Sequence, residues 1–165
     1  LSRQFSASQS GELYYAREFK KFHDSGDFPR NSDRNGGNNS VGATYRIDSH
    51  KKLGLVLGYA WDRDSTSAPW WAYTGQKATA RLNTEFAGLK VHFGLSSYDQ
   101  RYDDPFPGLT EKRHDQAREF SVNLVREITK KTSIVLSELY VKNRSNLGFF
   151  DYTRNIVGLF AIMTL

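Results

Sequence analysis

The chain has 165 residues, a net charge of +5 and a mean hydropathy of −0.62, and 38% of its residues are hydrophobic while 14% are aromatic. A helical transmembrane segment is excluded within these residues, because no apolar run approaches the roughly 18 residues that a spanning helix needs. Cysteine is absent, which excludes disulfide frameworks and cysteine-based zinc sites, and the Lys and Arg residues are dispersed along the chain, so we expect no nucleic-acid partner.

The first part of the chain predicts two strands and a long loop. Residues 1–11 form either an extra strand or a periplasmic lead-in, since Phe5 and Ala7 would share one face. Residues 13–22 predict a strand because apolar side chains recur there at alternate positions. Residues 24–39 are rich in Gly, Asn and Asp, which predicts a loop without regular structure.

Residues 41–47 and 53–61 predict two longer strands, joined by a short turn over residues 48–51. In both strands apolar residues alternate with small or polar residues, which is typical of a strand with one apolar face. The apolar positions are Val41, Ala43, Tyr45 and Ile47 in the first strand and Leu53, Leu55, Leu57, Tyr59 and Trp61 in the second. Residues 62–71 predict a second loop.

The clearest element is a hairpin over residues 76–101, with a tight turn at Ala87-Gly88. Each arm has about 11 to 13 residues, twice the usual length of a strand in a soluble protein. Strands of about 9 to 11 residues with one apolar and one polar face are long enough to cross a bilayer as β-structure. The hairpin therefore favours a membrane-spanning sheet.

The rest of the chain repeats this arrangement. Residues 102–115 predict a third loop, and two strands follow over residues 119–128 and 134–140, with a short turn between them. Residues 143–150 predict a fourth loop. The apolar face of the last strand consists of Val157, Leu159, Ala161, Met163 and Leu165.

The connections alternate strictly between short turns and longer loops. Outer-membrane barrels have short periplasmic turns and longer external loops. We therefore predict that residues 1–165 form a single all-β domain, an antiparallel up-and-down transmembrane β-barrel with about eight strands in this chain. If residues 3–8 add a spanning strand, the count becomes odd, and the barrel would be larger than this chain.

The alternation assigns candidate residues to the two faces. Charged side chains expected to face the lumen are Lys77, Arg81, Glu85, Lys90, His92, Glu119 and Glu127. They would set ion or solute selectivity in a wide barrel, or fill a narrow one with ion pairs. Aromatic residues expected to form girdles at the membrane interfaces are Tyr59, Trp61, Trp70, Trp71, Tyr73, Tyr98, Tyr140 and Tyr152.

No pattern in the sequence predicts catalysis, a cofactor or a metal site. The 4 histidines lack metal-ligand spacing, and Gly-x-Ser-x-Gly does not occur. Asp62-Arg63-Asp64 and Asp103-Asp104 are expected on external loops, where neither matches a calcium-loop pattern. We therefore expect a protein that is not an enzyme.

Short motifs in the second half of the chain point to a family. They are Trp71-Ala72-Tyr73-Thr74-Gly75, Tyr98 to Tyr102, Arg113-His114-Asp115, Asn143-Arg144-Ser145-Asn146 and Phe150-Asp151-Tyr152-Thr153-Arg154-Asn155. Residues 71–165 thereby resemble the C-terminal barrel of bacterial outer-membrane proteins with periplasmic tetratricopeptide repeats, including surface lipoprotein assembly modifiers and related export porins. The resemblance implies envelope protein partners and an exported lipoprotein or polysaccharide. Unlike that family, this sequence ends on Leu165 rather than an aromatic residue, and these residues contain no helical repeat.

The leading hypothesis is a barrel of the bacterial outer membrane, surrounded by lipid, that acts as a porin, a translocation or export channel, or a membrane anchor of an envelope complex. Because the sequence starts at Leu1 without a signal peptide, we expect a processed mature protein or the C-terminal part of a longer one. The alternative is a soluble β-barrel whose apolar faces point inward and bind a small apolar ligand.

Overall fold

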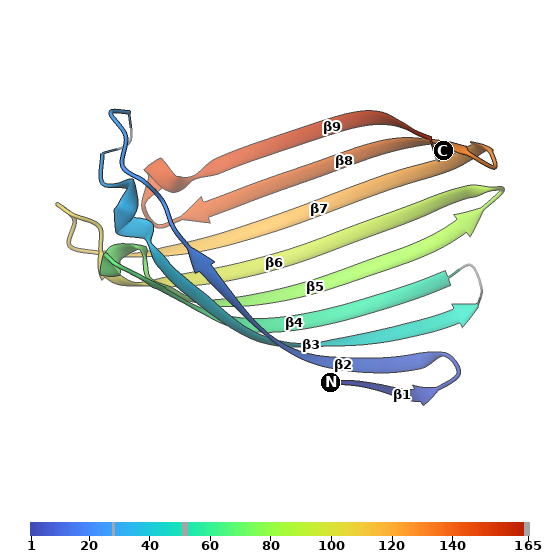
Figure 1. The fold of residues 1–165 in the computed structure, drawn as a ribbon, viewed down its shortest axis with the longest axis horizontal. Helices are drawn as coiled ribbons and strands as arrows, with labels where there is room; N and C mark the ends of the chain where they lie inside the picture. Colours follow the sequence, from blue (N-terminus) through green and yellow to red (C-terminus); the bar gives the residue numbers. More distant parts are fainter. Residues whose placement is uncertain (28, 51–52, 164–165) are drawn as a thin grey trace.

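The strands form one antiparallel sheet in which neighbours in sequence are neighbours in space (Figure 1). The structure is a computed structural model that describes residues 1–27, 29–50 and 53–163. Within these ranges the sheet has nine strands: β1 (Ser2–Ser6), β2 (Gln9–Lys20), β3 (Gly36–His50), β4 (Leu53–Thr66), β5 (Tyr73–Phe86), β6 (Leu89–Pro105), β7 (Lys112–Thr129), β8 (Thr132–Ser145) and β9 (Tyr152–Met163). The all-β, antiparallel up-and-down arrangement is confirmed.

The strands are longer than predicted at the end that carries the long loops. β6 has 17 residues and β7 has 18. Asp62 and Asp64 lie within β4, and Asp103 and Asp104 lie within β6, so their assignment to loops is wrong. Their charges suggested loop chemistry, yet Asp62 pairs in register with Gly75, so the ladder of backbone hydrogen bonds continues through them.

The connections differ at the two ends of the sheet, as Figure 1 shows. On the right of the view lie short turns such as Ala87-Gly88, where φ is 50° and 74° at the two residues. Two successive positive φ values characterise the type I′ turn, whose twist matches that of the flanking strands. On the left lie the longer loops, with the short 3₁₀ helices η1 (Asn31–Arg34), η2 (Pro69–Trp71) and η3 (Gly148–Phe150). The expected turn at Lys51 and the strand end at Leu165 fall outside the described residues.

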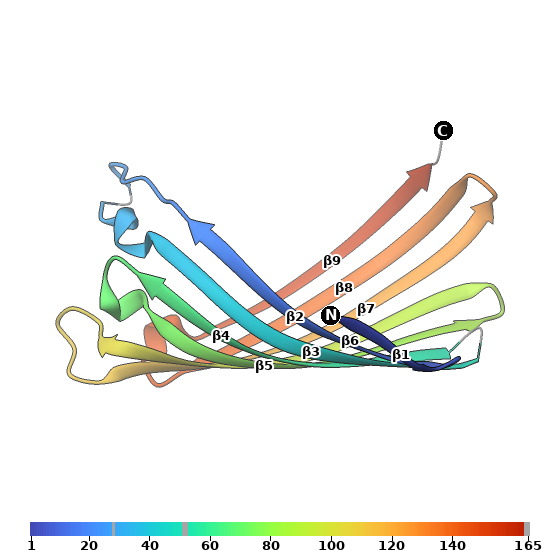
Figure 2. The same ribbon diagram turned by 60° about the horizontal axis from the view of Figure 1, so that its bottom comes forward.

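The sheet curves into a trough and does not close (Figure 2). Among the described residues no pairing joins β1 to β9. β1 covers the free edge of β2 near the short turns, where Arg3 pairs with Gly11 and the Leu1 and Leu13 backbones exchange two hydrogen bonds of 2.7 Å. The described residues therefore form an open sheet and not a closed barrel.

The register gives the trough two chemically different faces. One face is mainly apolar from Leu13 on β2 through Leu57, Leu82 and Leu95 to Leu159 on β9, and these side chains are exposed. Every buried residue within a strand lies on the other, polar face. Those residues are Val56, Asp62, Asp64, Gly75, Tyr102, Asp115, Val141, Asn143 and Gly42. Because side chains converge on the inside of a curved sheet, the polar face is the concave one.

Among the described residues of β2 to β9, three charged residues interrupt the apolar face: Arg17 between Tyr15 and Phe19 on β2, Arg126 between Leu124 and Ile128 on β7, and Glu138 on β8. Glu138 lies between Leu136 and Tyr140 on β8, in register with Val122 and Val157.

No helix in the described ranges is long and apolar enough to span a bilayer.

The first prediction concerns the turn at Ala87-Gly88. Replacing Gly88, whose φ is 74°, with Val should lower the free energy of unfolding by about 1–3 kcal/mol, because a β-branched residue is strained there. Gly26→Val is the control, since Gly26 has open space around it and no positive φ, and it should change stability by less than about 0.5 kcal/mol. Urea unfolding measures both variants, and equal effects would contradict the turn assignment.

Candidate functional site

The concave face carries the polar groups that could act on a solute. The charged residues predicted for the lumen all lie on it by register: Lys77, Arg81, Glu85, Lys90, His92, Glu119 and Glu127. They fall into two groups, one in the middle of the trough and one near the short turns. A third group, which the sequence did not identify, lies near the long loops.

In the middle of the trough, Glu119 is the centre of a small polar cluster. Lys77 Nζ is 3.9 Å from a carboxylate oxygen of Glu119, and the Ser96 hydroxyl donates to the same oxygen at 2.7 Å. Arg81 lies beside them on β5, opposite Gly94, and is exposed. Within the described part of the chain, Arg81 has no carboxylate within 4.0 Å, and its side chain lines a hollow on the concave face. A hollow of about 240 Å³ lies between these side chains.

Near the short turns the polar groups are paired. Lys90 Nζ is 2.5 Å from a carboxylate oxygen of Glu127, and Glu85 is in register with Lys90. His92 Nδ1 is 2.7 Å from the side-chain oxygen of Asn83. Both members of the Lys90–Glu127 pair are exposed to solvent, so the pair contributes little to stability.

Near the long loops a buried network crosses β2 to β6. The Asp62 carboxylate accepts hydrogen bonds from Asn38 at 3.0 Å and from the Tyr98 hydroxyl at 2.7 Å. Lys20 Nζ lies 2.5 Å from Asp64 Oδ2, while Asp64 Oδ1 has no partner within the residues described. Gly75 leaves the space this network needs, because a Cβ there would collide with Asp62 and Tyr98.

Arg113 connects the same end of the trough to the loops. It forms an ion pair with Asp115, the most buried side chain in the described residues at 2% exposure. Its guanidinium lies 3.4 Å from the centre of the Phe150 ring and 4.4 Å from that of Tyr102. Such cation–π contacts are worth about 2 kcal/mol when shielded from water.

Aromatic rings join three of the long loops above Arg113. The ring centroid of Trp71 in η2 is 5.6 Å from that of Phe106 and 6.3 Å from that of Phe150 in η3. Phe106 and Phe150 are 5.9 Å apart, and all three contacts are edge-on. The loops after β4, β6 and β8 are therefore held together at this end of the sheet.

The predicted aromatic girdle divides between different places. Tyr59, Trp61 and Tyr140 lie on the apolar face. Tyr73, Tyr98 and Tyr152 lie on the polar face, so they do not belong to a lipid-facing ring with the first three. Trp70 and Trp71 lie in η2. Strict alternation separates Trp61 from Tyr98, because Trp61 pairs with Gln76 while Tyr98 pairs with the next residue along β5, Lys77.

Sequence reasoning missed the buried network, although a signal for it was present. Asp62 and Asp64 continue the alternate positions of Gly54 to Ala60, and Tyr102 and Asp115 are in phase with Tyr98 and Glu119. Reading the alternation past the first charged residue would have placed these side chains on the concave face.

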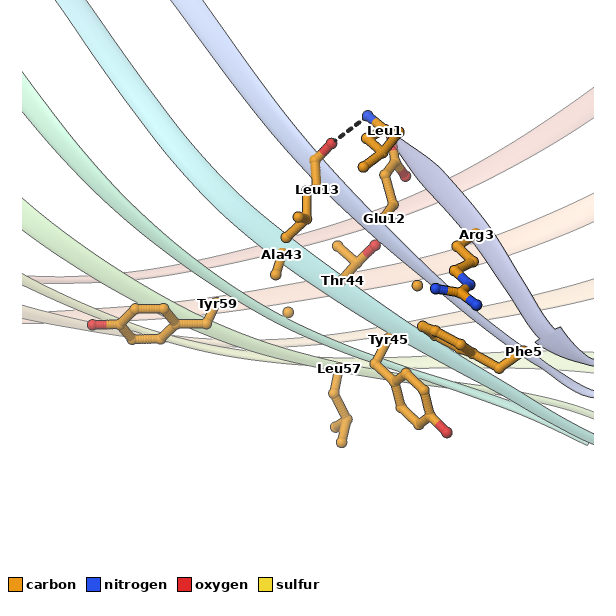
Figure 3. A pocket seen from close by; sticks show the side chains of 12 residues that line it. Leu1, Arg3, Phe5, Glu12, Leu13, Ala43, Thr44, Tyr45, Leu57 and Tyr59 are labelled. Carbon is orange, nitrogen blue, oxygen red and sulfur yellow. Dashed lines mark hydrogen bonds between the residues drawn. The ribbon is translucent and has the colours of Figure 1, made fainter.

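The apolar face also has a hollow, of about 580 Å³, over β1 to β4 (Figure 3). Its walls include Phe5, Leu13, Tyr45, Leu57 and Tyr59, and it exists because Gly11 and Ala43 between them are small. An acyl chain or a small apolar ligand would fit its chemistry. Among the described residues no group of three or more His, Asp or Glu side chains could hold a metal ion.

No protein-family model, curated protein or solved structure matches this chain.

The buried network makes the second prediction. Tyr98→Phe should lower the free energy of unfolding by about 1–3 kcal/mol, because the buried Asp62 carboxylate loses a hydrogen-bond donor. Tyr140→Phe is the control, since Tyr140 lies on the apolar face and its hydroxyl makes no hydrogen bond within the described residues, and it should change stability by less than about 0.5 kcal/mol. Denaturant titration measures the free energy of unfolding of both variants. If Tyr98→Phe leaves that free energy unchanged, the hydrogen bond from Tyr98 to Asp62 does not stabilise the fold.

Proposed function

We propose that this chain is a non-enzymatic transmembrane β-barrel, or part of one, in a bacterial outer membrane, and that its concave face lines a passage for polar solutes. The observation that carries the proposal is the apolar face, which stays exposed across the sheet while the concave face buries charges. Soluble monomers rarely leave apolar patches larger than about 300–600 Å² uncovered. Lipid is the medium in which such a face is stable.

The dimensions support a bilayer as the surroundings. On β5 the apolar face extends from Ala78 to Phe86, and on β6 from Leu89 to Leu95. At a rise of about 3.4 Å per residue the first of these spans about 27 Å along the strand and the second about 20 Å. With the strands tilted by about 35–45°, the first corresponds to a height of about 19–22 Å, close to the lipid-facing band of about 25 Å in outer-membrane barrels.

The arrangement of connections supports an orientation. Short turns face the periplasm and long loops face outward in such barrels. The network around Asp62 and Arg113 would then lie at the external end of the passage, where it narrows the opening. Arg81 would lie further in, beside the Lys77–Glu119 pair, in a position to select among ions.

The first β-strand bears on the size of the barrel. Because β1 covers the edge of β2 near the short turns, closure would proceed through β1 and not by pairing β2 with β9. Bacterial single-chain barrels have even strand numbers, and nine is odd. We therefore propose that at least one further strand lies between β1 and β9, and that the same protein or another chain supplies it.

The family resemblance extends the proposal to export. This chain resembles outer-membrane proteins of export systems, and the resemblance implies an exported lipoprotein or polysaccharide as cargo and envelope proteins as partners. The polar concave face is compatible with either cargo, and a barrel that only anchors an envelope complex would present the same apolar face.

Adjacent cysteine variants test the orientation of the faces. Arg81→Cys should react with a membrane-impermeant maleimide in reconstituted vesicles, because it faces the aqueous passage, while Leu82→Cys should be protected by lipid. The chain has no native cysteine, so labelling is specific. The opposite result, with position 82 buried in protein and the chain soluble without detergent, would favour the alternative of a soluble barrel that binds an apolar ligand in its interior.

Single-channel recording tests the passage. Arg81→Glu should raise the cation-to-anion permeability ratio severalfold, because it reverses a charge without a carboxylate partner on the concave face. Arg17→Glu, on the opposite face, should leave the ratio unchanged. If the two variants behave alike, the concave face does not line the conducting path.

Cross-linking tests the closure. With Arg3→Cys on β1, no intramolecular disulfide should form to Val157→Cys, Leu159→Cys or Ala161→Cys on β9, because another strand separates them. Leu13→Cys with Ala43→Cys, a registered pair, is the positive control. Efficient cross-linking of β1 to β9 within one chain would show that nine strands close alone.

A further inference from the structure

A group of basic side chains lies on the outward face just beyond the apolar belt, toward the long loops. The apolar rows of β6, β7 and β8 end at Leu95, Phe120 and Tyr140, which are in register with one another. Beyond this row the outward face carries Ser97, Asp99 and Gln116 together with five basic residues that we name the outer basic patch: Arg101, His114, Arg118, Lys142 and Arg144.

The register places like charges side by side in this patch. Arg118 on β7 is directly opposite Lys142 on β8, and Arg144 follows Lys142 on the same face, opposite Gln116. Like charges directly opposite each other on two strands are destabilising, and an anion bound between them would offset that repulsion. A dispersed, solvated polar surface would not need this arrangement.

The acidic residues nearby are already engaged. Asp99 contacts Arg101 at 3.3 Å and His114 Nε2 at 2.7 Å. Asp151, which lines the same shallow hollow as Lys142 and Arg144, accepts a hydrogen bond of 2.5 Å from the Ser145 backbone. Arg118, Lys142 and Arg144 have no carboxylate within 4.0 Å in the described part of the chain.

We propose that Arg118, Lys142 and Arg144 bind the phosphate groups of an anionic lipid headgroup in the leaflet on the side of the long loops. This inference rests on the proposed membrane barrel. The phosphates of a lipid lie directly above its acyl chains. Arg118 and Lys142 are the next outward positions after Phe120 and Tyr140, and Arg144 is one outward position further along β8. Guanidinium groups match phosphate oxygens with two parallel hydrogen bonds, and Lys adds a point charge.

The test measures how strongly the reconstituted chain enriches one lipid around itself. Vesicles of phosphatidylcholine with dansyl-labelled lipid A as a minor component are compared with vesicles that carry a labelled neutral lipid, and energy transfer from tryptophan reports enrichment. The variant is Arg118→Gln/Lys142→Gln/Arg144→Gln. The control is Arg154→Gln, which removes a cation at the same level on the concave face, opposite Val141.

The wild-type chain and Arg154→Gln should enrich lipid A equally. Each outward cation is worth about a fivefold preference, so the triple variant should lose on the order of 100-fold in total. If the triple variant inserts into the vesicles and still enriches lipid A, the inference is overturned, and the three cations belong to a solvated polar surface. A wild-type chain that binds inorganic phosphate but enriches lipid A no more than the neutral lipid would also overturn it, in favour of a small-anion site.

The failure of the barrel proposal gives a different result. A chain that never enters phosphatidylcholine vesicles, measured before any anionic lipid is added, overturns both proposals. A chain that enters them but shows no preference for lipid A overturns only the binding of headgroup phosphate.

Discussion

The structure depends on the alternation of side chains along strands that are held in register by backbone hydrogen bonds. Each step along a strand reverses the face, and each registered pair carries that assignment to the next strand. From β2 to β9 this rule keeps Leu57, Leu82 and Leu95 on one side and Asp62, Arg81 and Glu119 on the other. A slip of one residue would exchange the two faces, so the apolar belt and the polar trough depend on the same register.

The apolar residues contribute little to a conventional core. The buried hydrophobic residues among those described are few and small apart from Tyr102, while residues such as Trp61 and Leu159 are exposed. A water-soluble sheet gains its stability by covering such residues with a second layer. In lipid the same residues need no cover. The main constraint is then the pairing of backbone hydrogen-bonding groups, because each unpaired N–H or C=O in hydrocarbon costs on the order of several kcal/mol. The charged residues on the apolar face, Glu138 together with Arg17 and Arg126, are the features that fit this environment least.

Much of this arrangement follows from the amino-acid pattern, because period-two alternation is a local signal. The hairpin at Ala87-Gly88, the antiparallel order of the strands and the faces of Arg81 and Leu82 could all be derived from it. The strand ends near the loops could not, since Asp62 and Asp103 have the composition of turns and only their cross-strand partners keep them in the sheet. The aromatic contacts of Trp71 with Phe106 and Phe150 join residues far apart in sequence, and no local pattern encodes such pairings.

Whether the apolar face meets lipid can be measured most directly at Trp61, which lies on that face between Val41 and Gln76. In a Trp70→Phe/Trp71→Phe background Trp61 is the only tryptophan, because the chain has three. In vesicles whose lipids carry bromine on the part of the acyl chains near the headgroups, its fluorescence should be strongly quenched, and aqueous iodide should have little effect. Fluorescence that iodide quenches and brominated lipid does not would place Trp61 in water and contradict the membrane assignment.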